Sequence, residues 1–202
     1  MSTERNDHDA HRLGEIVEAS VASLTAQSHR LGEPPALGSI VRTMDGVVDI
    51  YAVVYNSATG SVDPGRRFTA LGAEEAEESG IYRSHPELTH LLRTDFHALV
   101  VGHAVDGKVR QYLPARPARI HAFVYMATTA EVREFTQETY FLQALAQASA
   151  PTKDDALASC VRIASEAHDD KQAFLLSAGR EIARLLGRDT PRLNAVLRRL
   201  RG

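Results

Sequence analysis

The sequence predicts an α+β protein, in which a small closed β-barrel of about six strands with one inserted short helix precedes a bundle of about four helices. Three observations predict this. Ten of the 13 glycines and six of the eight prolines lie in residues 1–127, which predicts many short elements separated by turns. β-Branched and aromatic runs recur there at short spacing, as in barrels and sandwiches. From residue 128 onward, apolar residues recur at steps of three and four, as in amphipathic helices.

These patterns divide the chain into a flexible N-terminus (1–12), a barrel domain (13–127) and a helical domain (128–202). Strands are predicted at residues 13–20, 24–29, 37–43, 48–55, 68–71, 96–104, 108–113 and 121–126. The turn dipeptides Asp45-Gly46 and Asp106-Gly107 each follow one of these runs and precede the next. We expect a closed barrel, because closure removes the exposed edges of a small open sheet.

One segment interrupts the strand pattern. Residues 74–78 are mostly acidic, and the stretch that follows contains Pro86, which suits the first position of a helix. Leu88, Leu91 and Leu92 share one face of that helix. The sequence therefore predicts one short helix inserted into the barrel and reached through a charged loop.

Four helices are predicted after residue 128. Thr128 and Glu131 have the spacing of a capping box, in which each side chain bonds a free backbone N–H group. Thr190 and Pro191 open the last helix. The remaining signals are a start at Pro151, a start with an acidic cap at Asp169 or Asp170, and a C-terminal cap at Gly187.

The composition is that of an ordinary globular protein, with 44% hydrophobic and 24% charged residues. A net charge of -3 lacks the basic excess of a strongly charged polymer binder. This charge combines a barrel part with 12 basic and 16 acidic residues and a helical part with 11 and 10. No apolar run approaches the ~18 residues that span a bilayer, so we expect a soluble, cytoplasmic protein with no membrane partner.

Residues that could carry chemistry do not combine into a known constellation. The single cysteine, Cys160, lies on an apolar helix stripe, where an inert buried thiol is the usual case. His97 and His103 are six residues apart on one predicted strand, about 20 Å at the rise of a strand, and cannot share one ion. There is no G-x-S-x-G nucleophile elbow. We expect no catalytic residues, no cofactor and no metal.

Two candidate contact surfaces remain. The first combines basic and aromatic side chains, and its members are Arg66, Arg67, Arg110, Tyr112, Arg116 and Arg119. Such residues suit nucleic acid or a protein interface, although turn arginines that pair with Asp63 or Glu87 are the alternative. The second is an apolar helix face that could dock a partner, formed by Leu193, Val196, Leu197 and Leu200. The arginines near the end of this helix also suit its dipole.

Four stretches of the barrel part resemble the HAS-barrel domain, the small barrel shared by HerA-type DNA-translocating ATPases and rotary ATP synthase subunits. They are GEIVEAS (14–20), PPALGSIVRT (34–43), IYAVVYNSATGSVDPGRR (50–67) and the pair LRTDFHALVVGH (92–103) and VRQYLPARPARIHAFVY (109–125). The resemblance is strongest to stand-alone bacterial members, and it covers a little over half of the chain. It implies a barrel that assembles subunits or docks partners.

The chain departs from the ATPases in one respect. No G-x-x-x-x-G-K-[ST] phosphate-binding loop follows the barrel. The first hypothesis is therefore a non-catalytic assembly or adaptor protein, whose barrel mediates homo-oligomerisation or docks onto a HerA-type ATPase or a nuclease. The second is a nucleic-acid-binding module that uses the basic patch. An enzyme is the third, and no residue pattern names its reaction.

Overall fold

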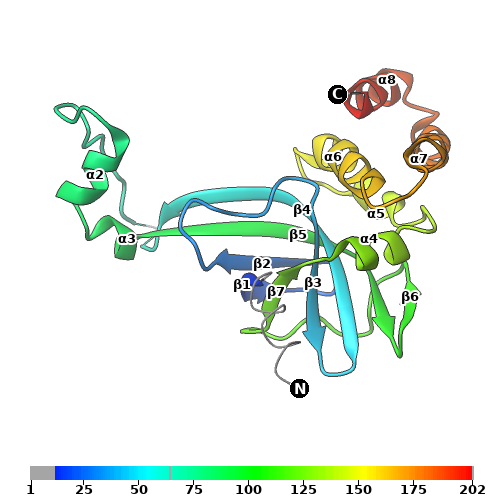
Figure 1. The fold of residues 1–202 in the computed structure, drawn as a ribbon, viewed down its shortest axis with the longest axis horizontal. Helices are drawn as coiled ribbons and strands as arrows, with labels where there is room; N and C mark the ends of the chain where they lie inside the picture. The colour runs from blue at the N-terminus through cyan, green and yellow to red at the C-terminus, as the bar shows by residue number, and fades with distance from the viewer. Residues whose placement is uncertain (1–11, 64, 202) are drawn as a thin grey trace.

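The computed structural model describes residues 12–63 and 65–201. Within them the chain forms a closed six-stranded antiparallel barrel followed by helices, as the sequence predicts (Figure 1). The strands of the barrel are β1 (Arg12–Ala19), β2 (Ser23–Ser28), β3 (Ile40–Asp45), β4 (Val48–Ser61), β5 (Leu92–Val105) and β7 (Phe123–Met126). They are ordered β2-β1-β7-β3-β4-β5, and the pairing of β2 with β5 closes the ring. The expected flexible N-terminus lies, apart from Arg12, outside the described residues.

Two strand predictions need correction. Residues 68–71 do not form a strand, so that prediction is wrong. The predicted strand at 108–113 is the short β6 (Lys108–Arg110), which pairs with β5 beside the ring. In contrast, β4 and β5 are each 14 residues long and extend beyond their predicted ends. The residues that extend β4, 56–61, pair with β5 from Asn56↔His97 to Ser61↔Leu92 and form a stalk with it, which β2 borders as far as Asp95.

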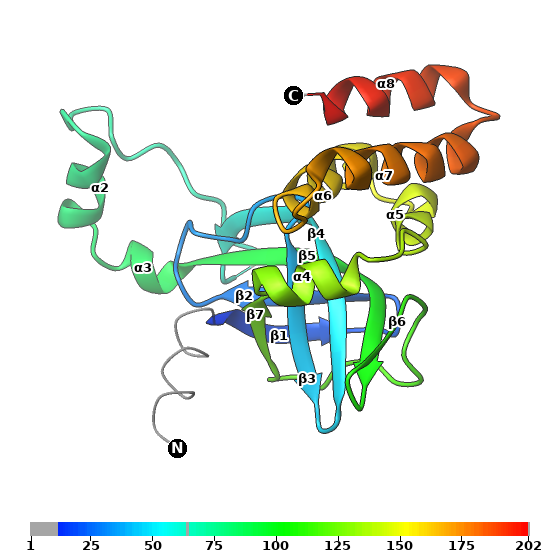
Figure 2. The ribbon, with the colours of Figure 1, turned by 45° about the vertical axis from the view of Figure 1, so that its right-hand side comes forward.

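The stalk carries the inserted segment away from the barrel (Figures 1 and 2). The insertion contains two short helices, α2 (Glu78–Ser84) and α3 (Leu88–Leu91), where the sequence predicts one. Pro86 lies in the turn between them, and α3 ends after four residues because the chain enters β5 at Leu92. We call residues 62–91 the arm.

The C-terminal part contains α4 (Thr129–Phe135), α5 (Leu142–Gln147), α6 (Lys153–Ser165), α7 (Lys171–Leu186) and α8 (Thr190–Leu200). The capping box of Thr128 and Glu131 is confirmed, as are the Asp170 cap of α7 and Gly187 at its C-terminal end. The first predicted helix is interrupted between α4 and α5. Gln111 occupies this break, because its Nε2 donates to the carbonyls of Phe135 (2.6 Å) and Glu138 (2.8 Å).

Strand β4 shows how the barrel and the helices are joined. Ile50, Ala52 and Val54 point into the barrel core, whereas the intervening Tyr51 and Val53 belong to a second core beneath the helices. This alternation follows from the two-residue period of a strand. It explains why the run VDIYAVVY is apolar throughout, and it means that the helices pack on the outer side of the barrel.

Close backbone approach reinforces this packing at two glycines. A Cβ on Gly102 would lie 2.8 Å from the Phe135 ring, and one on Gly38 would lie 2.5 Å from the backbone nitrogen of Cys160. Cys160 is fully buried, and this burial raises its thiol pKa to about 12. No helix in residues 12–63 and 65–201 has both the length and the apolar character needed to cross a bilayer.

Candidate functional site

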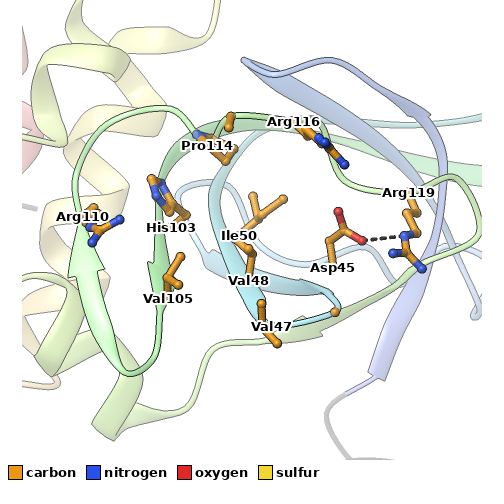
Figure 3. Close-up of a pocket in the computed structure, with 12 residues that line it drawn as sticks. Asp45, Val47, Val48, Ile50, His103, Val105, Arg110, Pro114, Arg116 and Arg119 are labelled. Atoms are coloured by element: carbon orange, nitrogen blue, oxygen red, sulfur yellow. Dashed lines mark ion pairs between the residues drawn. The ribbon is translucent and has the colours of Figure 1, made fainter.

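A cavity of about 570 Å³ opens at one end of the barrel (Figure 3). Two neighbouring hairpins form it, because the β3–β4 turn at Gly46 and the β5–β6 turn at Gly107 lie at the same end of the paired strands β4 and β5. The loop between β6 and β7 completes the wall with Pro114, Ala115, Arg116 and Arg119. We call this cavity the barrel-end pocket.

The floor and rim of the barrel-end pocket are largely apolar. Val48, Ile50 and Val105 line it from β4 and β5, and Ile50 is continuous with the barrel core. Val47, at the tip of the hairpin, is 78% exposed. More exposed apolar side chains flank the same end on adjacent positions of the chain: Met44, Tyr112, Leu113 and Ile120. Exposed apolar residues clustered around a hollow are typical of an interaction site.

The charge of the pocket is positive in a chain whose net charge is negative. Arg110, Arg116 and Arg119 line it, against the single acid Asp45. Arg119 pairs with Asp45 through Nε and Oδ1 at 2.5 Å. Arg110 and Arg116 are exposed, and neither forms an ion pair within residues 12–63 and 65–201. Two guanidinium groups are thus available to an anionic group that enters the pocket.

His103 and Tyr112 support the wall next to Arg110. The Nδ1 of the buried His103 donates to the backbone carbonyl of Tyr112 at 3.0 Å. The Tyr112 ring meets the His103 ring edge-on, with 5.2 Å between centroids. These contacts hold the start of the β6–β7 loop against β5, so the position of Arg110 is set by folded structure on both sides.

The basic patch predicted from the sequence is divided in the structure. Arg110, Arg116 and Arg119 share the barrel-end pocket, and Tyr112 is next to it. Arg66 and Arg67 lie in the arm, at the opposite end of β4. Arg66 packs over the Phe68 ring at 5.7 Å. The five arginines therefore do not form one surface. The alternative, in which a turn arginine pairs with an acid, holds for Arg119, whose acidic partner is Asp45.

Sequence reasoning missed Asp45, Val47, Ile50 and His103 as members of the site. A signal was present in the two Asp-Gly dipeptides at 45–46 and 106–107. Each marks a hairpin turn, and hairpins that share strand neighbours must place their turns at one end of a barrel. What the dipeptides do not reveal is that the β6–β7 loop folds back across this end.

The predicted docking face of the last helix is mostly occupied within the chain. Val196 is fully buried in the core beneath the helices, and Leu193 and Leu200 pack against that core. Leu197 is half-buried. Ion pairs hold α8 against α6: Arg192 pairs with Asp154 at 2.7 Å, and Arg199 pairs with Asp155 at 2.6 Å. These leucines therefore serve the fold of this chain.

A second hollow, of about 430 Å³, is lined by His168 and by the acidic pair Asp169-Asp170 that follows it. The His168 ring stacks on Phe174 at 4.2 Å, and Nε2 lies 2.8 Å from the Thr136 hydroxyl. Because that hydroxyl donates to a backbone carbonyl, Nε2 is the donor to it. Within the described part of the chain, no three His, Cys, Asp or Glu residues are grouped so that they could hold a metal ion.

His168 gives a prediction for pH. Burial, followed by the charge of Arg133, lowers its pKa. Because the unfolded chain then binds the proton more readily, His168 stabilises the fold above its ordinary pKa of 6.5, and this contribution is lost as pH falls toward the lowered value. Thermal unfolding at pH 7.5, 6.5 and 5.5 should show a smaller loss of Tm on acidification in His168→Gln than in the wild type. An equal loss in both would contradict this.

The fold and the site define a closed six-stranded barrel with an arginine-lined, apolar-floored pocket at one end and helices packed on its side. No protein-family model matches the sequence, and no significant match is found among curated proteins. The resemblance to HAS-barrel domains thus stays a prediction.

Proposed function

We propose that the chain is a non-catalytic assembly protein whose barrel-end pocket docks an acidic, partly apolar segment of a protein partner. The observation that carries this proposal is the combination of Arg110 and Arg116, which form no ion pair with any residue that the structure describes, with an apolar floor that includes Ile50. An assembly role is also what the resemblance to HAS-barrel domains implies. That resemblance points to a homo-oligomer, or to a HerA-type ATPase or an associated nuclease as the partner.

Chemistry favours a protein segment over a strand of nucleic acid. Arginine combined with exposed aromatic and aliphatic side chains is typical of protein interfaces. A single-stranded nucleic acid would need a continuous basic groove and aromatic platforms for successive bases. Here the arginines are divided between the two ends of β4, and the ring of Tyr112 already contacts His103. Nucleic-acid binding is therefore the second candidate, favoured only by the three arginines of the pocket.

The test is a fluorescence anisotropy titration with two labelled probes, poly(Glu,Tyr) peptide and a poly-deoxythymidine strand. We expect the peptide to bind and to bind less tightly as salt rises, because salt screens exposed charges beyond about 10 Å at 0.1 M. The variant Arg110→Glu/Arg116→Glu should bind the peptide roughly 10- to 100-fold more weakly, since like charges would then face each other.

The matched control is Arg180→Glu/Arg198→Glu, which makes the same change of charge at exposed positions on α7 and α8. It should bind the peptide like the wild type. An equal loss in both variants would show that only net charge matters, and the proposed site would be wrong. Binding of the DNA strand in preference to the peptide would replace the proposal with the second candidate.

A further inference from the structure

The arm carries acidic and exposed apolar side chains, which complement the arginines and the apolar floor of the barrel-end pocket. Its residues, 62–91, include six acids and three arginines, and four of the acids are concentrated in residues 74–78. Glu74 and Glu78 are exposed, and neither forms an ion pair within the described residues. Large apolar side chains are exposed on the same segment: Val62, Phe68, Leu71 and Tyr82. The arm is thus an acidic segment with aromatic and aliphatic contacts to offer.

The arm cannot reach the pocket of its own chain. The two lie at opposite ends of the ladder between β4 and β5, with Val48↔Val105 at the pocket and Ser61↔Leu92 at the base of the arm. Thirteen residue steps of β4 separate these points, which is about 40 Å along the strand. Figures 1 and 2 agree that the arm projects away from the barrel on the side opposite β6. An acidic arm in the pocket must therefore come from another molecule.

We propose that the partner of the barrel-end pocket is a second copy of this chain, whose arm inserts residues 74–82 between Arg110 and Arg116. This inference rests on the proposed function and names its partner. The carboxylates of Glu74 and Glu78 pair with the two guanidinium groups, and the side chain of Tyr82 contacts the apolar rim around Val47.

Such a contact is heterologous, because two different surfaces meet. After a first contact, one copy keeps an unused pocket and the other an unused arm, so assembly continues until a ring closes or a filament grows. A two-fold dimer, in contrast, would use one surface on both copies and stop. This difference provides the test.

The experiment uses two full-length variants and light scattering coupled to size-exclusion chromatography. The pocket variant is Arg110→Glu/Arg116→Glu, and the arm variant is Glu74→Arg/Glu78→Arg. The wild type should form oligomers larger than a dimer as concentration rises. Each variant alone should be a monomer, and circular dichroism should show both folded. An equimolar mixture should again form oligomers larger than a dimer, because the arm of each variant then meets an oppositely charged pocket on the other.

Two further variants complete the experiment. A chain that carries all four substitutions exchanges the charges and should assemble again, whereas Arg180→Glu/Arg198→Glu should assemble like the wild type. A wild type that stays monomeric, or variants that assemble unchanged, would overturn the inference. The arm variant separates this failure from that of the proposed function: if it still binds poly(Glu,Tyr) through Arg110 and Arg116, the pocket docks acidic segments and only the identity of the partner is wrong.

Discussion

Replacing Phe135 by alanine should lower the free energy of unfolding by about 3–5 kcal/mol, as is typical when a buried aromatic side chain is truncated. Phe135 is 1% exposed. Its ring stacks on Tyr51 of β4 at 4.7 Å and meets Phe141 edge-on at 5.6 Å. Because it lies between the barrel and the helices, its loss leaves a cavity that neither part can close alone.

The measurement is urea unfolding followed by far-ultraviolet circular dichroism and by tyrosine fluorescence. Both signals should change in one shared transition, in the wild type and in the variant, since the helices and the barrel share a core. The control is Tyr140→Ala, whose side chain is 64% exposed and should be nearly neutral. Two separated transitions in the wild type would contradict the shared core.

Replacing Arg42 by methionine should lower the free energy of unfolding by roughly 2–4 kcal/mol, because it leaves partly buried carboxylates without their cation. The Arg42 side chain is 10% exposed and pairs with Asp49 at 2.9 Å and with Glu131 at 3.1 Å. Glu131 also closes the capping box of α4. Burial, followed by the charges of Glu131 and Asp49, raises the pKa of the neighbouring Tyr51 to about 12.

A double-mutant cycle tests whether this loss comes from the ion pair. Glu131→Gln removes one stranded charge, so Arg42→Met/Glu131→Gln should be more stable than the sum of the two single changes predicts. Chemical denaturation of the four proteins gives the coupling. Strict additivity would show that Arg42 stabilises the protein only through its aliphatic packing.

Local sequence patterns predicted most of the fold. Capping residues, Asp-Gly turns and apolar runs act over a few positions, and the elements they indicate at Thr128, Gly46 and Asp170 are confirmed. The C-terminal end of β4 was missed because residues 56–61 are small and largely polar. They are exposed in the stalk, so only their pairing with β5 identifies them as a strand.

Long-range contacts account for the remaining differences. The break between α4 and α5 depends on Gln111, which precedes Phe135 by 24 residues and satisfies backbone groups that a continuous helix would pair. The predicted basic patch failed as one surface for a related reason. Arg66 and Arg67 follow the polar stalk, and its length places them at the opposite end of β4 from Arg110.

Cross-linking between two variants shows whether the acidic arm of one copy enters the barrel-end pocket of another. Val47→Cys places a thiol at the pocket rim, and Ala76→Cys places one in the arm without changing its charge; both positions are exposed. The native Cys160 is buried and gives no background in the folded protein. Gln172→Cys, exposed on α7, is the control partner.

After brief treatment with a short bismaleimide, a mixture of Val47→Cys and Ala76→Cys chains should give a cross-linked dimer whose tryptic peptides join the rim of the pocket to the arm. The mixture of Val47→Cys with Gln172→Cys should give far less. Equal cross-linking in the two mixtures, or none in the first, would show that the arm does not enter the pocket.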